Sequence, residues 1–84
     1  MQHQTSVALN KSMILGTVDA LSDMRFQRGE NGELMLKVGQ KHYLIQSKLT
    51  FHYHGAACRI QINHYNDQYI NFSLKGQDRL LLVV

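Results

Sequence analysis

The sequence predicts an all-β fold in one small domain, and three observations lead to that prediction. Apolar and polar residues alternate with a period of two along several segments, and no stretch of helical length carries an apolar stripe. Turn-forming pairs such as Asn31-Gly32 and Asn66-Asp67 separate these segments. The chain has 84 residues, which is room for one domain. Short strands at this spacing favour a small barrel or a sandwich.

The first half of the chain contains two expected strands. Residues 1–9 are polar, and we expect a flexible N-terminus there. Residues 12–19 are apolar around Gly16, which predicts a strand with a bend or bulge. Asn31-Gly32 tolerates positive φ and predicts a turn. The strand after this turn, residues 34–38, alternates so that its leucines and its valine share one face.

The second half of the chain alternates in the same way between turn signals. The expected strands cover residues 41–46, 49–53, 58–62 and 69–75. In the last two of these, Ile60 and Phe72 fall on the apolar faces and are expected in the core. An all-β chain this short has sheet edges that it cannot easily cover alone, which favours a barrel, a dimer or both.

Charge and cysteine content narrow the possible partners and compartments. Nine Lys and Arg against six Asp and Glu give a net charge of +3, which is compatible with a polyanionic partner. One cysteine excludes an intrachain disulfide framework and a four-cysteine zinc site. The N-terminal residues do not resemble a secretory signal, and the longest apolar run, residues 80–84, is far shorter than a membrane span. We expect a cytoplasmic protein.

The sequence contains no recognisable catalytic motif, so we expect a protein that is not an enzyme and uses no cofactor or metal. Most of its carboxylates fall at expected turns and strand ends, where solvated carboxylates are common. Cys58 alternates with Ile60 on an apolar face, which predicts a buried, unreactive thiol. His52 and His54 are spaced to lie on one side of a strand, but exposed histidines are a better interpretation than metal ligands.

The polar positions of the expected strands carry cations, amides and a tyrosine but no acid. In the last two clean strands these positions are Arg59, Gln61, Asn63, Tyr69, Asn71, Ser73 and Lys75, and earlier strands contribute Lys37, Lys41 and Lys48. Such a surface suits a single-stranded nucleic acid, because cations follow phosphates and rings stack on bases. An ordinary solvated sheet face fits the composition equally well.

The N-terminal third resembles bacterial single-stranded-DNA-binding proteins and the related primosomal replication protein N family. The segment Asn10–Val18 is similar to their first strand, with Asn, a basic residue, an apolar stretch and then Gly. Arg25-Phe26 follows at the spacing of their basic-aromatic pair. Lys41–Ile45 looks like their third strand, and residues 59–62 look like their fourth. The absence of tryptophan makes the chain more similar to the primosomal family.

This resemblance implies a five-stranded OB-like β-barrel over residues 10–84 that binds single-stranded DNA without catalysis, in replication restart or repair. It also implies a homodimer and contacts with replication or repair proteins. We expect phosphate contacts from the basic residues of the strands and turns, and base stacking from three aromatic rings. The basic residues are Arg25, Arg28, Lys37, Lys41, Lys48, Arg59 and Lys75, and the rings are Phe26, Tyr53 and Tyr69.

Two alternatives belong to other functional classes. Residues 71–76 fit the N-x-S-x-x-G signature of the cyclic-di-GMP-binding PilZ domain, although Arg25 and Arg28 are one residue too close for its second motif. The small size, strand-rich pattern and weak charge also fit a protein-protein interaction module, such as a phage or plasmid accessory protein that inhibits a host factor.

Overall fold

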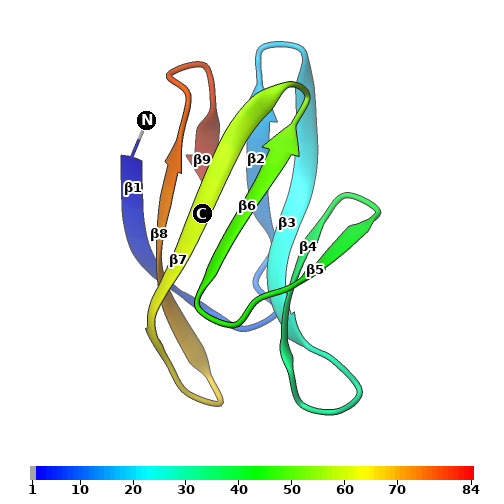
Figure 1. Ribbon diagram of the computed structural model, residues 1–84, viewed down its shortest axis with the longest axis vertical. Helices are drawn as coiled ribbons and strands as arrows, with labels where there is room; N and C mark the ends of the chain where they lie inside the picture. The colour runs from blue at the N-terminus through cyan, green and yellow to red at the C-terminus, as the bar shows by residue number, and fades with distance from the viewer. Residues whose placement is uncertain (1) are drawn as a thin grey trace.

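The computed structural model describes the backbone of residues 2–84 and the side chains from Gln4 onward, and it arranges them in two antiparallel sheets (Figure 1). The first sheet has the order β1-β8-β7-β6, and its strands are β1 (Gln2–Ala8), β6 (Lys48–Tyr53), β7 (Ala56–Tyr65) and β8 (Tyr69–Gly76). The second sheet has the order β5-β4-β3-β2-β9, and its strands are β2 (Met13–Thr17), β3 (Ala20–Arg28), β4 (Leu34–Val38), β5 (Lys41–Leu44) and β9 (Leu81–Val83).

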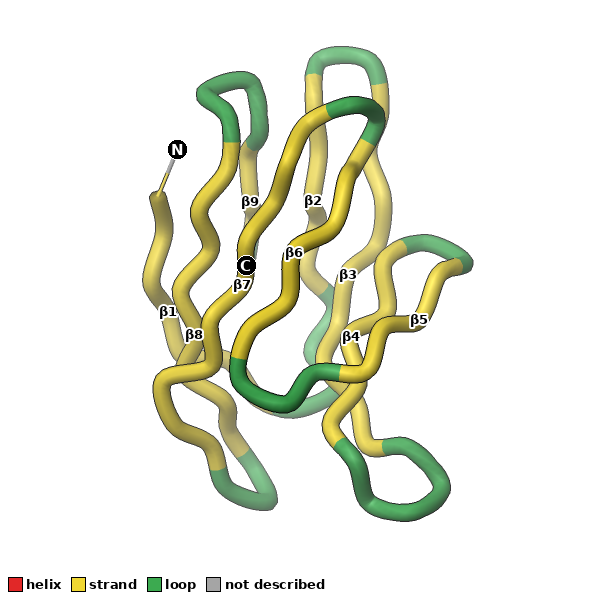
Figure 2. Tube along the Cα trace, in the orientation of Figure 1, coloured by secondary structure: helices red, strands yellow, loops and turns green. Residues whose placement is uncertain are grey.

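Strands joined by short loops make up most of the chain (Figure 2), and none of the described residues is helical. The all-β prediction is therefore confirmed. The chain crosses from one sheet to the other between β1 and β2, between β5 and β6, and between β8 and β9. Backbone hydrogen bonds fix the first two crossings, where Asn10 N donates to Phe26 O at 2.7 Å and Ile45 N donates to Leu34 O at 3.0 Å.

The core lies between the two sheets and is built from the alternation seen in the sequence. Leu34, Leu36 and Val38 of β4 are buried as predicted, while the residues between them are only partly covered. The rings of Phe26 on β3 and Phe72 on β8 meet with centroids 4.8 Å apart, and both side chains are fully buried. Because these rings come from different sheets, their contact holds the two layers together.

The strand count differs from the five-stranded barrel that the resemblance implies. The described residues form nine strands in two sheets, and no pairing among these strands joins the sheets into a closed barrel. Two of the unexpected strands are β3, whose charged and polar positions hide its alternation, and the short β9.

The N-terminus also differs from the flexible segment expected at residues 1–9. Residues 2–8 form β1, which pairs along its whole length with β8. Val7 is buried in the core and Leu9 packs against it, so the segment has an apolar anchor despite its polar composition. Met1 lies outside the described residues.

Candidate nucleic-acid interface

The outward side of the first sheet is a continuous polar surface, which we call the amide-rich face. The register places side chains from its four strands in rows, for example Gln4, Ser73, Gln61 and Lys48. The described members of the face are Gln4, Ser6, Ala8, Lys48, Thr50, His52, Ala57, Arg59, Gln61, Asn63, His64, Tyr69, Asn71, Ser73 and Lys75. None of these residues is acidic. The polar positions predicted for the last two strands share this face with Lys48, whereas Lys37 and Lys41 lie elsewhere.

Two cations lie directly opposite each other on this face. Arg59 of β7 pairs in register with Lys75 of β8, and Thr50 of β6 lies on the other side of Arg59. Among the described residues, no carboxylate forms an ion pair with Arg59 or Lys75. Lys48 lies one row further along, diagonal to Arg59. Since like charges directly opposite destabilise a sheet, this pair is an unneutralised anion-attracting site.

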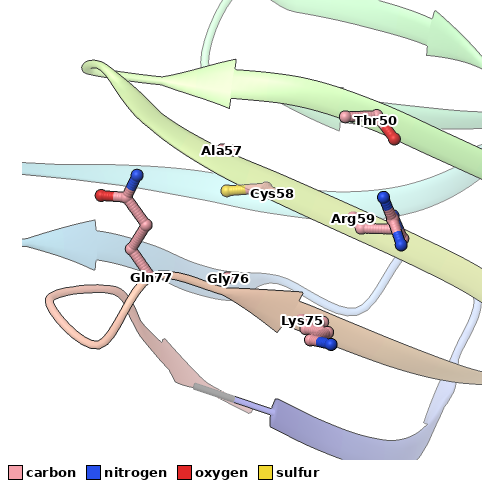
Figure 3. Close-up of a pocket in the computed structure, with 7 residues that line it drawn as sticks. All are labelled: Thr50, Ala57, Cys58, Arg59, Lys75, Gly76 and Gln77. Carbon is pink, nitrogen blue, oxygen red and sulfur yellow. The ribbon is translucent and has the colours of Figure 1, made fainter.

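A shallow depression of about 280 Å³ lies at this pair (Figure 3). Arg59 and Lys75 line it from neighbouring strands, and Thr50 and Gln77 add a hydroxyl and an amide. Cations, hydroxyls and amides are the side chains that bind phosphate oxygens. The depression therefore has the size and donor groups for an anionic group at the surface rather than for a buried substrate.

A hydrogen-bonded network of amides and hydroxyls occupies the middle of the face. Asn63 donates to the side-chain oxygens of Asn71 and Ser73 at 2.8 and 3.0 Å, and Asn71 donates to Ser6 at 2.7 Å. A register shift between Ile62 and His64 leaves Asn63 without a directly opposite residue on β8. Because of this shift, the Asn63 amide reaches the side chains of both Asn71 and Ser73. The network fixes these side chains in place on the outward side of the sheet.

Tyr69 lies at the far end of the face, where β8 begins. Its side chain is 56% exposed, and its backbone is held because Asn66 Oδ1 accepts hydrogen bonds from the backbone N–H groups of Gln68 and Tyr69 at 2.8 Å. Tyr69 and Lys75 are six residues apart on one strand, which corresponds to ~20 Å. An exposed ring and a cation site thus mark the two ends of one surface.

Four of the ten predicted contacts lie together here, namely Lys48, Arg59, Tyr69 and Lys75. Arg25 and Lys37 lie on the outer face of the second sheet instead, directly opposite each other on β3 and β4. Asp23 binds the Arg25 guanidinium with an N–O distance of 2.8 Å. Hydrogen bonds from the Ser12 hydroxyl and from Arg25 lower the pKa of Asp23, so this cation pair has a carboxylate beside it.

Arg28 and Phe26 have structural contacts. The Arg28 guanidinium lies 5.3 Å from the centroid of the Tyr65 ring and 3.6 Å from an Asp67 carboxylate oxygen, which ties the end of β3 to the β7–β8 hairpin. Phe26 is fully buried against Phe72, so the expectation that it stacks on bases is corrected. Its position in the alternation of β3 was hidden by the charged residues around it.

Lys41 and Tyr53 lie in a third place, a cleft between β6 and the β4–β5 hairpin. Tyr53 is buried, and its hydroxyl is 2.9 Å from the Ser22 hydroxyl.

The sequence interpretation missed Gln4 and Ser6 as members of the amide-rich face, because a flexible N-terminus was expected there. No sequence signal linked Thr50 and Gln77 to the cation pair, since their proximity depends on strand pairing.

Cys58 is fully buried and its thiol donates a weak hydrogen bond to Ala56 O at 3.8 Å. Burial raises the pKa of this thiol to about 11, as expected for an unreactive cysteine.

Within the described part of the chain, no three His, Cys, Asp or Glu side chains are grouped so as to hold a metal ion. The same residues form no helix that is long and apolar enough to cross a membrane.

Comparison with known proteins gives no match: no family model, no curated protein and no solved structure is similar to the chain. The resemblance to single-stranded-DNA-binding proteins therefore stays a prediction.

Proposed function

We propose that the chain binds single-stranded nucleic acid, DNA in the first instance, through the amide-rich face and without catalysis. The observation that carries the proposal is the unneutralised pair of Arg59 and Lys75 on adjacent strands. Their repulsion disfavours the folded state, and a phosphate bound between them removes it. A polyanion is the natural ligand for such a site.

The remainder of the face suits a strand rather than an isolated phosphate. Surfaces that bind single strands combine cations that follow the backbone with rings that stack on bases. Here Tyr69 supplies an exposed ring ~20 Å from Lys75 along β8. The network of Asn63 and Asn71 between them offers donors and acceptors to base edges.

An OB-like arrangement of these strands, open rather than closed into a barrel, is part of the same proposal, together with a role in replication restart or repair. It is supported by β2 and β5, which cover the segments that resemble the first and third strands of that family, and by the β7–β8 hairpin, which covers those that resemble the last two. The binding proposal stands independently of barrel closure, because all of its residues lie on one sheet.

The test is fluorescence anisotropy of a labelled oligo-dT, compared with the matching duplex, at about 50 and about 200 mM salt. We expect binding to the single strand that is stronger than binding to the duplex and that weakens as salt rises. Absence of binding to either DNA at the lower salt would exclude the proposal and favour a protein-interaction module.

We also propose that a second copy of the chain pairs with the β9 edge of the second sheet, which makes a homodimer. Exposed apolar side chains gather there, with Leu21 69% and Val83 55% exposed and Ile14 and Leu81 between them. β9 is the edge strand of that sheet, so two β9 strands paired about a two-fold axis would join the sheets of two copies. Sedimentation tests this proposal: Val83→Lys should convert a dimer to a monomer, and a wild-type monomer would contradict it.

A further inference from the structure

A cleft of about 520 Å³ is lined by residues of β6 and of the β4–β5 hairpin, which belong to different sheets. Phe51 and Tyr53 of β6 and Tyr43 of β5 line it. Its volume is within the range of about 300–1,000 Å³ that small-molecule sites occupy, and such sites are mainly apolar with a few polar groups. The cleft is separate from the depression at Arg59 and Lys75, and no lining residue is shared between them.

The aromatic rings of the cleft are held in place by contacts from both sheets. The ring centroids of Tyr43 and Phe51 are 5.1 Å apart with an interplanar angle of 31°. The Tyr53 hydroxyl is within hydrogen-bond distance of Ser22 on β3, and the Tyr53 ring meets His54 edge-on at 4.6 Å. Tyr43 is only partly buried, so part of its ring remains open to a ligand. The apolar wall is thus formed before any ligand arrives, which lowers the entropic cost of binding.

The rim of the cleft is basic. Lys41, His52 and His54 are exposed around it, and none of the described residues that line it is Asp or Glu. His54 and Gly55 have φ of 48° and 79°, which makes the two-residue β6–β7 turn. A left-handed backbone is uncommon for a residue other than glycine, although histidine adopts it more often than most. The turn places the histidine where the cleft opens.

We propose that this cleft binds one nucleotide, with the base against Tyr43 and the phosphate beside Lys41. An aromatic wall and a basic rim without carboxylates match a ligand that joins a planar ring to an anion, since bases stack on aromatic side chains and phosphates bind cations. The ligand has two possible sources, a free nucleoside monophosphate or one nucleotide of a bound strand.

The second source rests on the proposed function, and the geometry connects the two sites. β6 is the edge strand of the first sheet, so it contributes both to the amide-rich face and to the wall of the cleft. His52 belongs to both surfaces, and it follows Thr50 on the same side of β6. A nucleic-acid strand that crosses from Lys75 over Arg59 to Thr50 passes from β8 to β6. This path covers two spacings between β-strands, ~10 Å, before it reaches the cleft.

The experiment is a titration of the full chain, followed by two-dimensional amide NMR spectra, with thymidine monophosphate in one arm and an oligo-dT of about 12 nucleotides in the other. We expect the monophosphate to shift the resonances of Lys41, Tyr43 and His52 at a lower concentration than that of Lys75, where only its phosphate has a partner, and to leave that of Tyr69 unchanged. Shifts of the cleft resonances by the oligonucleotide alone would assign the cleft to a nucleotide of the strand.

Lys41→Gln tests the phosphate contact, because this exposed residue can be changed without disturbing the core. It should weaken monophosphate binding to the cleft by roughly fivefold or more, whereas the control Lys75→Gln should leave the affinity of the cleft unchanged.

If neither ligand shifts the cleft resonances, the cleft proposal is overturned. Shifts at Tyr69 and Lys75 by the oligonucleotide would then still support the proposed function. Conversely, a monophosphate in the cleft with no effect of the oligonucleotide on the face would support the cleft and overturn the proposed function.

Discussion

Arg59 and Lys75 lie directly opposite each other on β7 and β8, and no carboxylate of the described residues neutralises them. Arg25 and Lys37 have the same relationship on β3 and β4, but Asp23 binds Arg25 there. The two sheets thus carry equivalent cation pairs that differ in whether a carboxylate is present. Removing one cation from each pair therefore separates a binding role from an ordinary surface charge.

We predict that Lys75→Gln weakens binding to oligo-dT and does not destabilise the fold. Loss of one phosphate contact should reduce the slope of log affinity against log salt by about 0.7, the value for a single strand. Relief of repulsion with Arg59 should leave the free energy of unfolding unchanged or raise it by up to about 1 kcal/mol. Anisotropy at several salt concentrations and urea unfolding measure the two effects.

Lys37→Gln is the matched control for this prediction. It removes the same charge from the outer face of the second sheet, so the net charge of the two variants is equal. Its effect on oligo-dT binding should be small in comparison. Equal loss of affinity in both variants would show that binding depends on net charge rather than on the amide-rich face.

Tyr69→Ala should weaken single-strand binding, because it removes the exposed ring at the end of the face. Loss of one stacked base costs about 1–3 kcal/mol, which is roughly a 5- to 150-fold fall in affinity. Tyr69→Phe keeps the ring and should retain most of the affinity, and neither change should alter stability by more than about 0.5 kcal/mol. Unchanged binding by the alanine variant would remove Tyr69 from the interface.

The ring pair of Phe26 and Phe72 should contribute to stability as a unit, because it joins the two sheets. Phe26→Leu and Phe72→Leu are each expected to lower the free energy of unfolding by about 1–3 kcal/mol. A double-mutant cycle by urea unfolding should give a coupling energy of about 0.5–1.5 kcal/mol, the usual contribution of an aromatic pair. Additive effects would mean that the sheets are held by general burial alone.

The alternation of apolar and polar residues predicted the strands that have one apolar face. β4, β7 and β8 were expected close to their observed positions, and Cys58 and Phe72 are buried as predicted. The turn at Asn31-Gly32 was also found, with a φ of 80° at Gly32. These features depend on neighbouring residues, so the sequence contains the information directly.

Pairing between distant strands could not be predicted in this way. β1 has a polar composition and forms a strand because β8, more than sixty residues away, offers an edge to it. The same long-range pairing determines which cations meet: Arg59 faces Lys75, whereas Arg25 faces Lys37 on the other sheet. Eight of the ten predicted contacts are therefore distributed over three surfaces by the fold, while Phe26 lies in the core and Arg28 contacts the β7–β8 hairpin.

Cys58 provides a pH-dependent test of the core. Its pKa is about 11 in the folded protein against an ordinary value of 9.0, so the unfolded chain loses this proton first as pH rises. Above about pH 9 the unfolded state therefore binds fewer protons than the folded state, and stability must fall with pH. The loss should reach about 1 kcal/mol by about pH 10.

The Cys58→Ala variant lacks this contribution. Between about pH 8 and about pH 10, the free energy of unfolding of the wild type should therefore fall by about 1 kcal/mol more than that of the variant. Urea unfolding at both pH values measures it, and a difference that does not vary with pH would mean that the thiol is accessible to water.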